Sequence, residues 1–176
     1  MHFVPGYSMM AATATTFMLS MIFLLLPGQS KKQYMRFWGL SWLVYSAMFL
    51  LDFCHLNWNF VYLGYVMLRQ MLALLGSYTF LLGTHHFFQI KCPAALGFAA
   101  IISTISMILY PASYPVYTLM IIPNIIFSSG LLIYSGCMFI AISWTQKLPE
   151  KLIASFLIIL WSIFINHKEF SLKNQQ

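Results

Sequence analysis

Residues 31–53 read KKQYMRFWGLSWLVYSAMFLLDF, a short basic cluster followed directly by an apolar stretch. The basic side chains at the start are costly to place in hydrocarbon, whereas residues 37–51 carry no charge. A membrane boundary is therefore predicted between them. Because short loops rich in lysine and arginine stay on the cytoplasmic side, this cluster is placed inside. The predicted interface anchors are Lys31, Lys32, Arg36, Trp38 and Trp42.

The composition is that of an integral membrane protein. The chain has 176 residues, of which 61% are hydrophobic and only 7% are charged, and its mean hydropathy is +0.81. A soluble domain of this length needs a larger share of charged residues to cover its surface. We therefore predict an all-α fold, a polytopic transmembrane bundle of about six helices, because helices satisfy their own backbone hydrogen bonds in lipid.

Hydrophobic runs separated by polar turns give the expected boundaries. Residues 1–170 are predicted to form one integral membrane domain, followed by a polar tail at 171–176. The predicted helices cover residues 9–26, 37–53, 70–88, 94–110, 116–144 and 152–165. The last of these is the shortest, below the ~17 residues that a straight crossing needs, so whether it spans stays open.

The basic residues also give the expected orientation. Lys91, Lys147 and Lys151 lie in later turns on the same side as the first cluster, whereas the first two turns on the other side carry neither lysine nor arginine. We therefore place the chain in the cytoplasmic membrane with its N-terminus outside. The net charge of +6 is explained by these turns and by anionic lipid headgroups, so no nucleic-acid partner is expected.

Residues 60–88 form one apolar run that is too long for a single straight crossing and is interrupted by Arg69 and Gln70. Two alternatives follow. Either Arg69 lies within the bilayer as a functional charge, or the chain follows the outer interface and crosses only from about residue 70. The second is favoured, because an arginine side chain can reach the headgroups from that depth and the apolar stretch after it is long enough to span.

Five residues are candidates for binding a ligand or sensing a signal. Asp52 and His55 lie at the end of the second predicted helix and are placed to pair with Arg69 across a short turn, either as a ligand site or as a solvated interfacial cluster. Pro123 interrupts a helix beside Asn124, so a kink with freed backbone carbonyls is expected there.

Small residues in the third predicted helix indicate a packing face. They recur at spacings of three, four and seven, which lets a neighbouring helix approach closely. They are Ala73, Gly76, Ser77, Gly83 and Thr84.

No residue set for catalysis or for a bound cofactor is visible. The three acidic residues are scattered, and no phosphate-binding loop, nucleophile elbow or HExxH motif occurs. His85 and His86 are adjacent, so on a helix they point apart, and no further ligand lies near them in a metal-binding spacing. We expect no enzymatic activity, no metal and no cofactor. No disulfide framework is expected among Cys54, Cys92 and Cys137.

Two segments carry aromatic patterns that go beyond composition. After the basic turn, Tyr34, Trp38, Trp42 and Leu51 match the pattern YxxxWxxxWxxxxxxxxL. Residues 157–170, LIILWSIFINHKEF, are similar to LWGxHKxxxPF, with serine in place of the glycine, a longer spacing and no proline; the counterparts are Leu160, Trp161, His167, Lys168 and Phe170. Together the segments resemble the multi-pass N-terminal sensor regions of bacterial sensor histidine kinases and diguanylate cyclases.

This resemblance implies a signal-input region that feeds a cytoplasmic output domain. No kinase or cyclase module is present, so the chain is either a truncated input region or a free-standing protein of similar layout. We expect a sensory module whose partners are the lipid bilayer, a second copy of the chain and a cytoplasmic output domain or protein. The alternatives are a small transporter or permease subunit, motivated by Asn124 and by an intramembrane Arg69, and a membrane scaffold.

Overall fold

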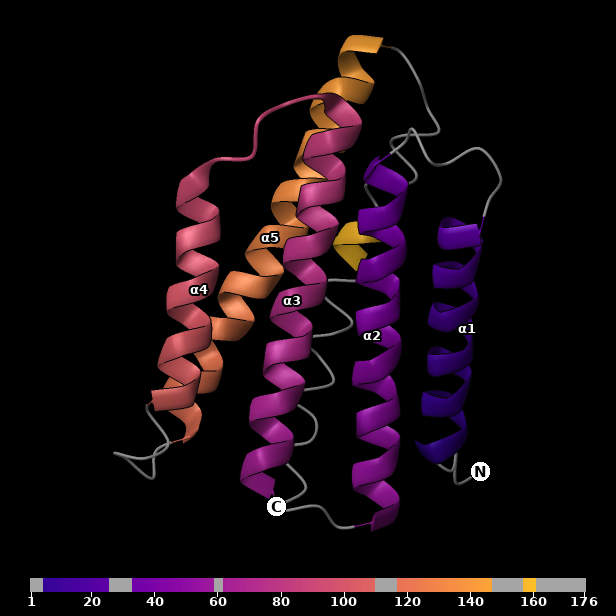
Figure 1. Cartoon of the computed structure of the whole chain (residues 1–176), viewed down its shortest axis with the longest axis vertical. Helices are drawn as coiled ribbons and strands as arrows, with labels where there is room; N and C mark the ends of the chain where they lie inside the picture. The colour runs from indigo at the N-terminus through magenta and orange to yellow at the C-terminus, as the bar shows by residue number, and fades with distance from the viewer. Residues whose placement is uncertain (1–4, 26–32, 59–61, 110–116, 147–156, 161–176) are drawn as a thin grey trace. The chain divides into compact units, whose positions relative to one another are not determined.

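The computed structural model describes residues 5–25, 33–58, 62–109, 117–146 and 157–160. Its helices are α1 (Pro5–Leu25), α2 (Gln33–Trp58), α3 (Tyr62–Phe88), α4 (Ala94–Leu109) and α5 (Tyr117–Gln146), as Figure 1 shows. Residues 157–160 are helical as well, and no strand occurs among the described residues. The predicted all-α helical fold is confirmed.

Four of the described helical stretches are long and apolar enough to cross a membrane: Tyr7–Leu25, Gln33–His55, Gly64–Phe88 and Pro123–Ile142. A shorter apolar stretch, Ala94–Ser106, lies in α4. The prediction of a multi-helix membrane protein agrees with these stretches. Of the predicted last helix only residues 157–160 are described, and the tail at 171–176 and the anchors Lys31 and Lys32 lie outside the described residues.

Internal contacts divide the chain into two compact units, Met1–Asn124 and Ile125–Gln176. The second unit contains most of α5. Its buried Ser129 and Ser135 donate their hydroxyls to the carbonyl oxygens of Ile125 and Leu131, at 2.6 and 2.9 Å. These serines therefore find acceptors within their own helix.

In the first unit, α2 lies between α1 and α3 (Figure 1). Contacts along the α2–α3 interface join Asp52 to Arg69 and the Ser41 hydroxyl to the carbonyl oxygen of Gly76, at 2.9 and 2.7 Å. Residue numbers thus fall along α2 as they rise along α3, so the two helices are antiparallel. The short connection at residues 59–61 is consistent with this arrangement of neighbours.

Two glycines of α3 let aromatic rings of α2 approach the helix backbone closely. A Cβ added to Gly83 would lie 2.5 Å from Cδ1 of Trp38, and one added to Gly76 would lie 3.1 Å from the ring of Tyr45. The other small residues predicted for this face, Ala73, Ser77 and Thr84, are buried. The side of α3 that carries the glycines therefore faces α2, and close packing there accompanies the hydrogen bond from Ser41 to Gly76.

Trp38, which the sequence assigns to the membrane interface, belongs to an aromatic cluster within the first unit. Its ring lies 5.3 Å from that of Tyr34, 6.0 Å from those of Phe23 and Phe80, and 5.4 Å from that of Phe87. Trp38 is half-buried, so much of its apolar surface packs on protein.

The largest difference from the predicted boundaries is at the start of α3. This helix begins at Tyr62, whereas its start was predicted from the sequence near residue 70. Arg69 lies inside the helix because Asp52 compensates its charge there, and the helix need not end for the side chain to reach water. Similarly, α2 extends beyond the predicted end at residue 53 to Trp58, which places His55 within the helix as well as Asp52.

The end of α3 is a left-handed turn at Gln89, whose φ is 57°. The backbone N–H of Ile90 donates to the carbonyl oxygen of His85 at 3.0 Å. This bond gives a hydrogen-bond donor to a carbonyl oxygen that would otherwise have none at the end of the helix. It also fixes where the chain leaves α3 before α4.

Candidate functional site

Six polar side chains of the first unit form two hydrogen-bonded groups, and both groups include residues of α3. We call them together the polar layer. Its members are Asp52 of α2, Tyr65, Arg69 and Gln70 of α3, Ser103 of α4 and Asn124 of α5. All are buried except Ser103, which is half-buried.

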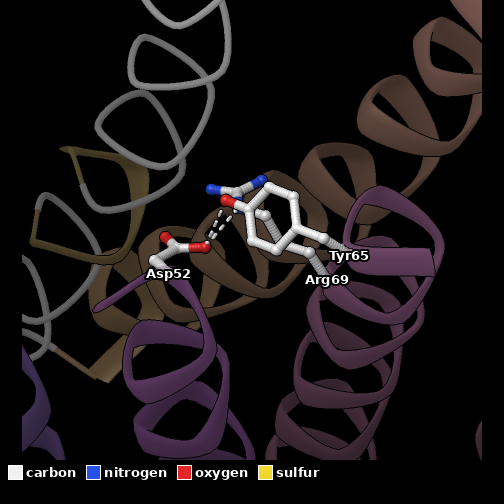
Figure 2. Close-up of polar contacts among 3 residues, drawn as sticks. All are labelled: Asp52, Tyr65 and Arg69. Atoms are coloured by element: carbon white, nitrogen blue, oxygen red, sulfur yellow. Dashed lines mark hydrogen bonds and ion pairs between the residues drawn. The ribbon is translucent and has the colours of Figure 1, made fainter. Parts of the chain in front are cut away.

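The first group is built on an ion pair. Arg69 Nε lies 2.9 Å from Oδ1 of Asp52, and the two side chains are only 4% and 1% exposed. The Tyr65 hydroxyl donates to the same oxygen at 2.9 Å. Figure 2 shows both bonds converging on one carboxylate oxygen. The other oxygen, Oδ2, is buried and has no hydrogen-bond partner among the described residues.

Helix geometry explains how these side chains meet. Tyr65 and Arg69 are four residues apart on α3, so they project from the same face, toward the last turns of α2. A carboxylate that accepts from a guanidinium and a hydroxyl makes stronger hydrogen bonds than a neutral acceptor. Even so, the desolvation of both charges offsets much of the attraction, so the pair is a weak source of stability and a strong constraint on the position of both helices.

His55 contacts the first group through the ring of Tyr65. The imidazole is stacked on the phenol ring, with centroids 3.8 Å apart and planes 7° from parallel. The stack confines the Tyr65 ring, and so the hydroxyl that donates to Asp52.

The second group joins α3, α4 and α5. The Asn124 amide nitrogen donates to Gln70 Oε1 at 2.8 Å and to the Gln70 backbone oxygen at 3.3 Å. The hydroxyl of Ser103 donates to Asn124 Oδ1 at 3.0 Å. Arg69 and Gln70 are consecutive, so the two groups lie next to each other on α3.

Of the five predicted signal or ligand residues, the structure brings three to the first group. Asp52 and Arg69 are bonded directly, and His55 lies behind Tyr65. Asn124 belongs to the second group, whereas Pro123 is exposed beside it and α5 continues through the proline.

The sequence interpretation missed three members of the polar layer: Tyr65, Gln70 and Ser103. Tyr65 was recoverable, since its spacing of four from Arg69 puts both on one helical face once α3 is extended backwards. Gln70 stood out as a polar interruption but had no identifiable partner. Nothing in the sequence distinguishes Ser103 from the other serine of α4, Ser106.

Groups of three or more potential metal-ligating side chains do not occur in the part of the chain that the structure describes. His86, at the end of α3, instead stacks its ring on Phe37, with centroids 5.0 Å apart. The described cysteines, Cys54, Cys92 and Cys137, are free thiols.

Comparisons of the chain with protein-family models, curated protein sequences and solved structures find no significant match, so any function must be argued from the polar layer itself.

Proposed function

We propose that this chain is a signal-input module of the cytoplasmic membrane, in which the polar layer holds one of two helix packings. The observation that carries the proposal is the buried Asp52–Arg69 ion pair between α2 and α3. Ionisable side chains within membrane helices are costly and typically mark functional sites. A stimulus that alters either charge would alter the α2–α3 packing and pass the change to a cytoplasmic output domain or protein.

The energetics of a buried pair suit such a role. While both charges are present, each compensates the other, and the helix ends stay together. When one charge is lost, the other remains buried without compensation, which costs about 3–5 kcal/mol. That energy exceeds the gap of a few kcal/mol that separates two populated conformations of a protein, so a single local event is sufficient to change the favoured packing.

The rest of the α2–α3 interface supports a hinge-like change rather than complete separation. The contacts of Ser41 with Gly76 and of Trp38 with Gly83 lie far along the helices from Asp52 and do not depend on any charge. These contacts would hold the two helices together while their ends near Asp52 move apart.

Distances between spin labels in proteoliposomes test the proposal. Labels at Leu50 and Leu68 report the interface near the ion pair, and labels at Leu40 and Leu75 report it further along; all four side chains are exposed. In Arg69→Gln we expect a second, longer Leu50–Leu68 distance, with the Leu40–Leu75 distance unchanged. The measurement is double electron–electron resonance on a background without native cysteines.

The outcome that would contradict the proposal is a single, unchanged Leu50–Leu68 distance in both wild type and Arg69→Gln, given that the variant retains its helical circular dichroism. Equal broadening of the Leu50–Leu68 and Leu40–Leu75 distance distributions would also contradict it, because the proposal requires a change confined to the helix ends near Asp52. The singly labelled variant Leu68→Cys is the control: its helical circular dichroism shows whether the label itself unfolds the protein.

A second candidate function is transport of a small solute, favoured by Asn124. This residue lies beside Pro123 and bonds to Gln70, and interrupted helices with polar side chains form substrate sites in transporters. Proteoliposomes tested for uptake of acetate, glycerol and amino acids distinguish the two functions. Uptake that is lost in Asn124→Leu would favour transport over signal input.

The proposed orientation, with the N-terminus outside, is testable with native thiols. A membrane-impermeant maleimide added to intact cells should label Cys54 and should label Cys92 only after permeabilisation. Burial raises the pKa of the Cys92 thiol, so less thiolate is present at neutral pH and labelling should quicken as the pH rises. The reaction is therefore run at mildly alkaline pH, and the reverse pattern would overturn the orientation.

A further inference from the structure

Oδ2 of Asp52 is the feature of the polar layer that the helix packing leaves unexplained. Oδ1 accepts from both Arg69 and Tyr65, whereas Oδ2 is buried without a hydrogen-bond partner among the described residues. An ionised carboxylate shares its charge equally between its oxygens, so one charged oxygen is buried without a hydrogen bond from a described residue. Such an oxygen is a strong acceptor with no donor.

We propose that Asp52 Oδ2 is a proton-binding site and that the proton is the signal. The inference rests on the proposed signal-input function and names its ligand. A proton on Oδ2 forms one O–H bond and leaves Oδ1 as an uncharged carbonyl oxygen, which is a weaker acceptor for Tyr65 and Arg69 than the carboxylate was. No other bond is made or broken.

The charge balance then couples this proton to the helix packing. With Asp52 ionised, the pair with Arg69 is neutral. With Asp52 protonated, the buried group carries the single positive charge of the guanidinium, which burial disfavours strongly. The long arginine side chain relieves this by moving its charged end toward water, and α2 and α3 separate near Asp52. The closed packing is therefore present where Asp52 is ionised and is lost as the pH falls.

Few other titratable groups face Asp52 from the described helices. From α3 these are Tyr65 and Arg69, and on α2 itself His55 stacks on the far side of Tyr65. The only titratable side chain of α1 is Tyr7, which is 73% exposed, and α4 has none.

The small number of acidic residues makes the site directly observable. The chain has three Asp and Glu residues in total, so Glu150→Gln together with Glu169→Gln leaves Asp52 as the last side-chain carboxyl. Infrared difference spectra of this double variant in proteoliposomes, recorded while the pH is lowered, should gain the carbonyl band of a protonated carboxyl group. The band should shift in deuterium oxide and vanish when Asp52→Asn is added.

The same samples carry labels at Leu50 and Leu68, so protonation and packing are measured together. We expect the longer distance to appear over the same pH range as the carboxyl band, and at every pH in Asp52→Asn. His55→Gln in the same background, which removes the imidazole and keeps Asp52, should retain the band. A band that is lost in His55→Gln would overturn the assignment of the proton to Asp52.

The inference and the function on which it rests fail in different ways. An acid-induced band that survives Asp52→Asn, or the absence of any band, overturns the proton site, even where Arg69→Gln still shows two distances. A band that belongs to Asp52 without any change in the Leu50–Leu68 distance supports the proton site and overturns signal input through α2–α3 packing. Because the double variant leaves Asp52 intact, the result does not depend on the folding of Asp52→Asn.

Discussion

The α2–α3 interface has two ends that are held together by different forces. We call the region around Asp52, Tyr65 and Arg69 the charged end, and the region around Trp38 and Gly83 the glycine end. At the glycine end, aromatic rings lie on a helix backbone that carries no side chain at the point of contact. At the charged end, the helices meet through an ion pair whose strength depends on the protonation of one carboxyl group.

This difference assigns different roles to the two ends. Steric packing has one favourable arrangement and does not respond to pH. In a buried ion pair, by contrast, the loss of one charge leaves the other buried without compensation, which destabilises the packing. A protein that must change its packing in response to a stimulus needs one end of each kind, a fixed end that keeps the helices paired and a conditional end that moves. The following variants break or sharpen this contrast.

Removal of one charge at the charged end should have the largest effect. Arg69→Met leaves the Asp52 carboxylate buried without its cation, and we expect the free energy of unfolding to fall by about 3–5 kcal/mol. SDS titration of the detergent-solubilised protein measures it. The double variant Asp52→Leu with Arg69→Met removes both charges and should be more stable than Arg69→Met alone; a strictly additive double variant would show that the two residues do not interact.

A single methyl group at the glycine end should have the next largest effect. Gly83→Ala places a Cβ 2.5 Å from Trp38 Cδ1 and 3.1 Å from Phe37 Cβ, so we expect a loss of about 1–3 kcal/mol. The matched control is Gly64→Ala on the same helix, where nothing lies within 4 Å. The control should be neutral or gain up to about 1 kcal/mol from helix propensity. Equal changes in the free energy of unfolding for the two variants would contradict the steric role of Gly83.

Loss of the second hydrogen-bonded group should cost less. Asn124→Leu removes the bond to Gln70 Oε1 and the acceptor of Ser103, and interhelical hydrogen bonds of membrane proteins contribute about 0.6–2 kcal/mol. The same SDS titration measures the change. Ser106→Ala is the control, because Ser106 is exposed and bonds within α4. A loss as large as that of Arg69→Met would mean that the second group, not the ion pair, dominates the polar layer.

The smallest effect is expected beyond the glycine end, where α3 stops. Gln89 has a φ of 57°, which costs a residue with a side chain about 1 kcal/mol relative to glycine. Gln89→Gly should therefore stabilise the protein by up to about that amount. Its midpoint of thermal unfolding should rise, and Gln33→Gly at the exposed start of α2 should not raise it.

Much of the fold could be predicted from the sequence, because the solvent decides it. Long apolar runs must become helices in lipid, since no other local structure satisfies their backbone groups, and the described helices follow those runs. The start of α3 was placed wrongly for an instructive reason. Arg69 was treated as a charge that seeks headgroups, which is correct only when no partner lies within the protein.

Part of the candidate site could also be predicted from the sequence. Asp, Arg and Asn are rare within long apolar runs, so Asp52, Arg69 and Asn124 stood out, and the short turn between the second and third predicted helices indicated that Asp52 and Arg69 could pair. Their partners were not, because tyrosine, glutamine and serine are ordinary in membrane helices. Only a neighbour in space distinguishes Tyr65 or Ser103 from the many residues like them.

The sequence by itself determined that the chain is a set of apolar helices, since hydrophobicity and backbone hydrogen bonding are properties of each segment alone. The tertiary structure decided which polar groups meet, because a hydrogen bond or an ion pair between helices depends on their relative rotation and on their register. That Asp52 accepts from Tyr65 and Arg69 through one oxygen is a fact of helix packing, and no pattern along the chain encodes it.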